Sequence, residues 1–171
     1  MLNIKKVALS CALLIGLNAG SAQAQDCGEV SITEMDWGSA VIVTQVAKFL
    51  LEQGYGCSVT VVPSASTPAL ASVSETGEPD IITEVWTNGA PAYVPLLEAG
   101  KINELTNVLS DGGLEGLFIP VYLAEAHPEL TTIEGVLANP DLVGNRMHNC
   151  PVGWTCQVVA SNVAKAGGFE A

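Results

Sequence analysis

Two periods of apolar residues alternate along the first part of the chain. Runs rich in Val, Ile and Thr predict strands, and apolar residues three and four positions apart predict helices. The expected strands cover 30–33, 58–62 and 81–86, and the expected helices cover 43–51, 68–75 and 93–98. Before the second helix, Ser66-Thr67-Pro68 supplies a capping side chain and a proline for the first turn. The order β-α-β-α-β-α predicts an α/β fold with a parallel, doubly wound sheet.

The pattern changes at a glycine-rich stretch, 111–116, which breaks both periods and predicts a hinge or a crossing between domains. After it we expect a strand over 117–123, a helix near 133–137 and a last helix that starts near Cys156. The chain stops at Ala171 in the middle of this pattern. We therefore expect a first α/β lobe over 25–115 and the start of a second lobe over 116–171, which is left incomplete.

The first 24 residues have the layout of a cleavable secretory signal peptide. Lys5 and Lys6 precede an apolar run over 7–17, and Ala22-Gln23-Ala24 forms a small-residue cleavage site. The apolar run is too short to span a bilayer, which takes about 20 residues. We expect a mature protein that starts at Gln25 and lies free in the periplasm.

The charge balance excludes a nucleic-acid-binding function. The chain has 6 Lys and Arg residues against 18 Asp and Glu residues, a formal net charge of −12, and the few basic residues form no patch. Binding to phosphates needs such a patch. Because 49% of the residues are hydrophobic, the chain is expected to fold rather than to remain disordered.

Four cysteines remain once Cys11 leaves with the signal peptide. They are Cys27, Cys57, Cys150 and Cys156. An even number of cysteines in an oxidising compartment predicts disulfides, with three possible pairings. Proximity in the sequence favours Cys27 with Cys57 and Cys150 with Cys156.

Two other interpretations of the cysteines remain open. Cys150 and Cys156 could hold a metal ion together with His148 and His127, although the chain has no C-x-x-C pair. A Cys/His hydrolase is the other interpretation, and it requires a free thiol because a disulfide-bonded sulfur cannot act as a nucleophile.

The three tryptophans are the candidate binding residues. Trp37 follows the first expected strand, Trp86 ends the third, and Trp154 comes just before the last helix. In open α/β sheets, ligands bind beyond the carboxyl ends of the strands, although a single Trp can equally fill a core. Glycines and prolines flank all three and favour loops. Indole faces suit a quaternary ammonium group, which cannot donate a hydrogen bond, and a helix N-terminus beside them could accept a carboxylate.

The segment 150–156, with Gly153-Trp154 inside the cysteine pair, resembles the disulfide-closed Trp loop of a known family. The family is that of the glycine betaine, proline betaine and choline substrate-binding proteins of ABC importers. The run 81–86 resembles the family's strand that ends in a ligand-stacking Trp, and 118–122 is similar to the strand that enters its second lobe. The resemblance covers 25–171.

The resemblance implies a type II periplasmic-binding-protein-like fold, in which two lobes close over a small ligand. Trp86 and Trp154 would be walls of an aromatic box, and Trp37 matches a Trp that some choline-binding members use. The backbone amides of Thr155 and Cys156 would hold the carboxylate of a betaine. Some betaine binders have a His shortly after the Trp that corresponds to Trp86, and this chain has none there.

The function implied is capture of a quaternary ammonium osmolyte and its delivery to an ABC permease in the inner membrane. It needs no cofactor, metal or catalytic residue, and we expect the full-length protein to be a monomer. One alternative is a binder of another small solute, such as an amino acid or a guanidino compound, for which Arg146 is the candidate ionic anchor. The other alternative is a secreted thiol or metal enzyme.

Overall fold

The computed structural model describes residues 27–169, so the expected signal peptide, 1–24, lies outside the described part. The elements in chain order are β1 (Glu29–Met35), α1 (Gly38–Tyr55), β2 (Ser58–Ser64), α2 (Ser66–Thr76), β3 (Ile81–Ile82), α3 (Tyr93–Glu98), α4 (Val121–Ala126), the 3₁₀ turn η2 (Pro128–Thr131), α5 (Ile133–Ala138), the 3₁₀ turn η3 (Pro140–Val143) and α6 (Thr155–Gly167). Within residues 27–169, no helix is both long enough and apolar enough to cross a membrane.

The three strands form a parallel sheet in the order β2-β1-β3. Strand β1 pairs with β2 along its whole length, from Glu29 opposite Ser58 to Met35 opposite Ser64. Its pairing with β3 is short and joins Ile32 to Ile81 and Thr33 to Ile82. The alternation of strands and helices in this part confirms the predicted α/β class with a small parallel sheet.

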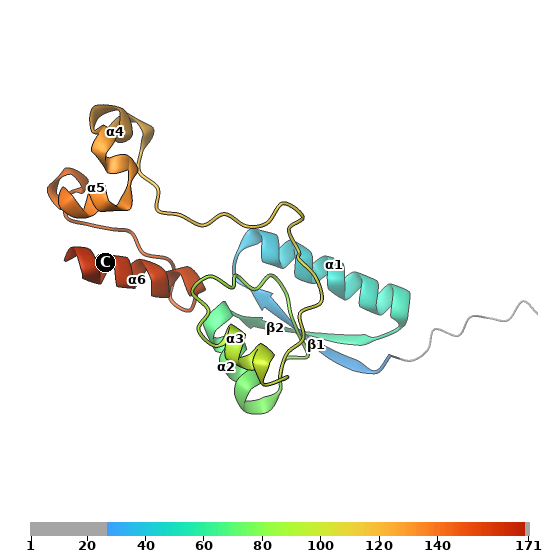
Figure 1. Ribbon diagram of the computed structural model, residues 1–171. Helices are drawn as coiled ribbons and strands as arrows, with labels where there is room; N and C mark the ends of the chain where they lie inside the picture. Colours follow the sequence, from blue (N-terminus) through green and yellow to red (C-terminus); the bar gives the residue numbers. More distant parts are fainter. Residues whose placement is uncertain (1–26, 170–171) are drawn as a thin grey trace, which may run out of the picture.

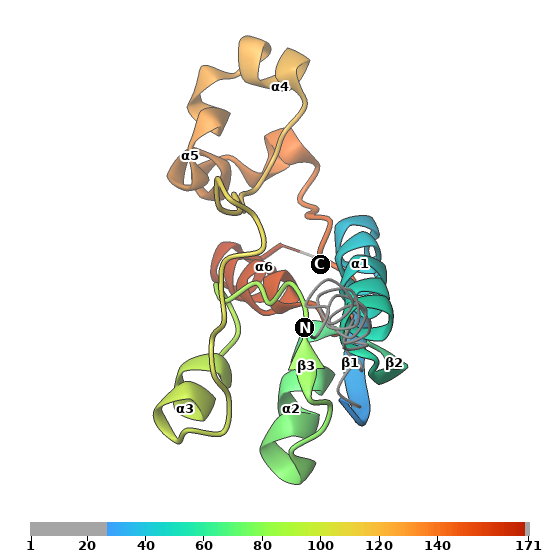
Figure 2. The same ribbon diagram turned by 90° about the vertical axis from the view of Figure 1, so that its right-hand side faces the viewer.

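Helices cover both faces of the sheet, as Figures 1 and 2 show. The chain moves from β1 to β2 through α1, and then from β2 past β1 to β3 through α2. Right-handed crossovers in opposite directions place their helices on opposite faces. This arrangement determines where the hydrophobic core lies. Ile32 and Val59 are buried beside α1, and Met35 is buried with Ala40 of α1 and Ala69 of α2.

The disulfide between Cys27 and Cys57 forms as predicted. It joins Cys27, two residues before β1, to Cys57, the residue just before β2, with the two Cα atoms 4.5 Å apart. Cys57 is buried in the same core cluster as Ile32 and Val59. The bond therefore fixes the amino-terminal end of the sheet, opposite the end where the strands lead into the loops that carry the tryptophans.

Two expected elements of the first half of the chain differ in detail from the structure. The expected strand over 81–86 ends at Ile82, because Glu84 takes a positive φ of 51° and turns the chain out of the sheet. Helix α2 begins at Ser66, and its N-cap is Ala65, without a side-chain hydrogen bond. The predicted start at Pro68, capped from Ser66-Thr67, is therefore wrong by two positions, and Ser66 is instead buried in the first turn.

The predicted strand over 117–123 is wrong. Residues 117–120 have no regular structure, and helix α4 begins at Val121 directly after Pro120. A strand needs a neighbour to accept its backbone hydrogen bonds, and the sheet formed within residues 27–169 has only β1, β2 and β3. Without such a neighbour, the helix-favouring Leu, Ala and Glu residues of 121–126 determine the local structure.

The two helices predicted for the second half of the chain are confirmed. Helix α5 covers Ile133–Ala138, and the Thr132 hydroxyl caps it by accepting a hydrogen bond from the Gly135 amide. Helix α6 covers Thr155–Gly167 and starts one residue before Cys156. Figure 1 shows α4 and α5 away from the sheet at the end of an extended connection, whereas α6 returns towards the carboxyl ends of the strands.

Candidate ligand-binding site

The sheet order places a crevice between the loops that follow β1 and β3. These strands are neighbours, but the chain leaves them towards opposite faces of the sheet. Such a switch point is where ligands bind in open α/β sheets. Trp37 lies in the loop after β1 and serves as the N-cap of α1, and Trp86 lies four residues beyond the end of β3. Both tryptophans are half-buried.

One buried carboxylate joins these two tryptophans. Glu84 Oε1 accepts hydrogen bonds from Trp37 Nε1 at 2.7 Å and from Trp86 Nε1 at 3.2 Å. The Ser39 hydroxyl donates to the same oxygen at 2.8 Å. The polar edges of both indoles are therefore fixed towards Glu84.

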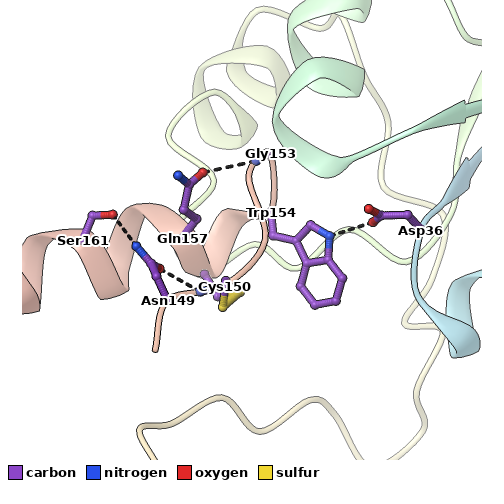
Figure 3. Close-up of a disulfide and its surroundings, with 8 residues drawn as sticks. Asp36, Asn149, Cys150, Gly153, Trp154, Gln157 and Ser161 are labelled. Carbon is purple, nitrogen blue, oxygen red and sulfur yellow. Dashed lines mark hydrogen bonds between the residues drawn. A yellow bond between two sulfur atoms is a disulfide. The ribbon is translucent and has the colours of Figure 1, made fainter. Parts of the chain in front are cut away.

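Trp154 reaches the same place from the far end of the chain. Its Nε1 donates to Asp36 Oδ1 at 2.6 Å, as Figure 3 shows. Its ring meets that of Trp37 edge to face, with centroids 5.0 Å apart and an interplanar angle of 64°, a favourable aromatic geometry. The structure thus brings together all three predicted tryptophans, which we call the tryptophan cluster (Trp37, Trp86 and Trp154).

The loop that carries Trp154 is closed by the disulfide between Cys150 and Cys156, the second predicted pair (Figure 3). Gly153 takes a positive φ of 95°, and its carbonyl accepts a hydrogen bond from the Thr67 amide in the first turn of α2. An added Cβ at Gly153 would lie 3.0 Å from the Cβ of Ala65. Only glycine permits both this backbone conformation and this close approach. The loop is therefore held against the start of α2.

Helix α6 begins at Thr155, so Thr155 and Cys156 occupy its first turn, as predicted. The Gln157 amide donates to the Trp154 carbonyl, and the Gln157 side chain accepts from the Gly153 amide. The first amides of a helix have no carbonyl partner in the helix itself and attract anions. Thr155 is 3% exposed and Cys156 is half-buried.

A hollow of about 850 Å³ lies on the other side of Trp86, between β3, α2 and residues 101–113. Trp86 and Glu84 line it, but Trp37 and Trp154 do not. A Cβ on Gly113 would lie 2.5 Å from Trp86 Cζ3, so the backbone of the glycine-rich stretch 111–116 packs directly on the indole ring. Tyr93 also lines the hollow, and the hydrogen bond that it donates to Glu104 raises the pKa of the Tyr93 hydroxyl.

Comparison of the sequence with models of known protein families shows the family to which the chain belongs. The family model described as the substrate-binding domain of the ABC-type glycine betaine transport system matches residues 28–171. The chain belongs to this family. A search of curated proteins finds no match. The chain is therefore a substrate-binding protein of an ABC importer, and the family implies a small-molecule ligand and a permease partner.

Family membership also bears on the type of activity and the compartment. Substrate-binding domains of this kind bind solutes and are not enzymes. They typically lie outside the cytoplasm, where disulfides such as the two in this domain persist.

The structure does not assemble the alternative sites. All four described cysteines are in disulfides, so none of them is a thiol nucleophile. Among residues 27–169, no group of His, Cys, Asp or Glu side chains is arranged to hold a metal ion. His127 pairs with Glu129 at 3.4 Å, and His148 and Arg146 are exposed.

Sequence reasoning missed the carboxylates of the substrate-binding domain. Asp36 and Glu84 accept the hydrogen bonds of all three indoles. For Glu84 a signal existed, because it is an acidic residue inside the apolar run 81–86, where a buried strand was expected. Charged residues are almost never fully buried without a partner, so such a position marks a candidate site.

Proposed function

We propose that this substrate-binding protein captures a quaternary ammonium compatible solute, such as glycine betaine, proline betaine or choline, and delivers it to its permease. The observation that carries the proposal is the tryptophan cluster, in which three indoles from three separate elements meet at the switch point of the sheet. Cation–π attraction contributes about 0.5–2 kcal/mol for each ring in contact with a desolvated cation.

In this proposal Trp37, Trp86 and Trp154 surround the ammonium group. The indole N–H groups are occupied by Asp36 and Glu84, so the rings offer the ligand their π faces rather than their donors. The first-turn amides of Thr155 and Cys156 would donate hydrogen bonds to the carboxylate of a betaine, supported by the N-terminus of α6.

The proposal includes two lobes, 25–115 and 116–171, which close over the ligand by motion at 111–116. It is supported by the origin of the cluster, because Trp154 comes from the second segment and contacts Trp37 and Asp36 of the first. A signal peptide over residues 1–24 would take the protein to the periplasm, where it would act as a monomer.

Calorimetric titration of the full-length protein tests the ligand class. Glycine betaine, proline betaine, choline and carnitine should be compared with arginine and glutamine as control solutes. We expect at least one quaternary ammonium compound to bind with micromolar affinity, and neither control to bind. Binding of arginine alone would contradict the proposal and favour the interpretation with an ionic clamp.

A substitution at Gly89 tests whether the position of α6 matters for binding. Gly89 has a φ of 83°, and an added Cβ would lie 2.7 Å from both the Thr155 carbonyl oxygen and Val159 Cγ2. Gly89→Ala should displace the start of α6, and with it Trp154, and weaken ligand binding about tenfold in the same titration.

The matched control is Gly77→Ala. Gly77 has a nearly identical φ of 81°, but a Cβ there would meet nothing within 4 Å. It carries the same backbone strain without moving α6. We expect its affinity to be that of the unchanged protein, and an equal loss in both variants would mean that strain alone accounts for the effect.

A further inference from the structure

Glu84 has a conformation and an environment that a merely structural residue would not need. It is a non-glycine residue with a φ of 51°, in the sparsely populated left-handed region, and only 6% of it is exposed. Such backbone strain persists only where the surroundings enforce it, and it often marks functional sites. Here the three donors on Oε1, from Trp37, Ser39 and Trp86, hold the side chain in place.

The carboxylate has hydrogen bonds on one side only. Its Oε2 atom is buried and has no hydrogen-bond partner within residues 27–169. No Lys, Arg or His side chain in this part of the chain contacts it, since the contacts between basic and acidic side chains there join Lys48 to Glu52 and His127 to Glu129. The site therefore contains a buried carboxyl group without a basic partner among residues 27–169.

A buried charge without a counter-charge is unfavourable, and the contacts of Glu84 do not require it. The side-chain oxygen of a glutamine could accept the same three hydrogen bonds. The presence of an acidic side chain at this position, rather than a neutral one that accepts the same hydrogen bonds, therefore needs an explanation. A cation that binds among the indoles would supply the missing partner.

We infer that Glu84 is a specificity-determining residue, whose buried charge selects ligands with a net positive charge over zwitterions. This inference rests on the proposed function and deepens it, because it predicts that a choline-type cation binds more tightly than a betaine. Asp36 also favours cationic ligands, because its carboxylate accepts the hydrogen bond of the third indole, that of Trp154.

The selection follows from electrostatics. A cationic ligand is attracted by Glu84 across the indole rings, where the effective dielectric constant is lower than that of water. Hydrogen bonds from the indole N–H groups to a carboxylate also polarise the rings and make their faces more attractive to a cation. In a betaine, the ligand's own carboxylate lies close to its ammonium group and offsets much of the attraction.

The test is Glu84→Gln, which keeps an acceptor for both indoles and removes the charge. Calorimetric titration of the full-length protein with choline and with glycine betaine should show choline bound at least tenfold more tightly before substitution. In the variant we expect choline to bind about tenfold more weakly and glycine betaine to change by threefold or less. The ratio of the two affinities is the readout that a merely structural role of Glu84 would not move.

Glu34→Gln is the matched control. Glu34 lies in β1, two residues before Asp36, and its carboxylate accepts a hydrogen bond from Gln45 rather than from an indole. The control removes one unit of charge from the same region without touching the tryptophan cluster. We expect it to leave the ratio of the two affinities unchanged.

Each remaining outcome overturns the inference in a recognisable way. Equal weakening of both ligands in Glu84→Gln would show that Glu84 only positions the indoles. Glycine betaine bound as tightly as choline by the unsubstituted protein would overturn the charge selection, whether or not the variant folds. Binding of neither ligand by the unsubstituted protein would overturn the proposed function, and this inference with it.

Discussion

Replacing Trp154 with alanine is expected to weaken binding of a quaternary ammonium ligand by about thirtyfold, or about 2 kcal/mol. The variant loses a π face next to the cation and the apolar area that the ring covers. It also removes the partner of Trp37 in the edge-to-face pair. Calorimetric titration with choline and glycine betaine measures the loss.

Folding should change much less than binding, because Trp154 is half-buried and lies in a loop at the surface of the domain. Circular dichroism of the thermal transition checks this point. If Trp154→Ala does not fold, Trp154 belongs to the core and the proposed cage is incorrect.

Trp86→Ala should show a loss of binding of similar size. Trp86 belongs to the same tryptophan cluster, where its indole shares the acceptor Glu84 with Trp37.

Two further variants separate the π face of Trp154 from its size. Trp154→Phe keeps an aromatic face with a weaker quadrupole and should retain part of the affinity. Trp154→Leu keeps much of the apolar contact without a π system and should bind more weakly than Trp154→Phe. Equal binding by Trp154→Leu and the unchanged protein would reduce Trp154 to an ordinary apolar contact.

Removal of the disulfide between Cys27 and Cys57 is expected to give the largest loss of stability. The bond closes a loop with a sequence separation of 30 residues, and the chain-entropy model assigns such a loop roughly 3.7 kcal/mol. The double variant Cys27→Ala, Cys57→Ala should therefore unfold at a much lower urea concentration, measured under non-reducing conditions. Ligand affinity should be kept while the protein remains folded, because the bond lies at the end of the sheet opposite the tryptophan cluster.

The second disulfide supplies the contrast. Cys150 and Cys156 are separated by 6 residues, so the same model assigns their bond only roughly 2.4 kcal/mol. Because the loop that it closes carries Trp154, the double variant Cys150→Ala, Cys156→Ala should lose affinity as well as stability. If the two double variants had the same effect on affinity, the closed loop would have no special role in presenting Trp154.

The sequence predicted the first three β-α units well because their signals are local. The apolar spacing in α1 and the β-branched residues of β1 and β2 depend on close neighbours in the chain. The expected strand over 117–123 failed because a strand also depends on a partner, and local composition carries no information about whether one is present. Predicting an element is thus more reliable than predicting what it pairs with.

The same distinction explains the candidate site. The tryptophans could be found because each lies at the end or just before the start of an expected element, with a glycine or proline within three residues. Their acceptors could not, because the bond from Trp37 to Glu84 spans 47 residues and that from Trp154 to Asp36 spans 118. Such contacts follow from the strand order β2-β1-β3, which the pattern of strands and helices does not specify.

The gathering of the tryptophans at one place has a practical consequence for spectroscopy. The chain contains three tryptophans, and all of them belong to the cluster. The entire indole fluorescence of the protein therefore originates at the candidate binding site, without background from the core or from distant loops. With the rings of Trp37 and Trp154 only 5.0 Å apart, excitation energy can pass between them. The unlabelled protein thus carries its own optical reporter of ligand binding at the tryptophan cluster.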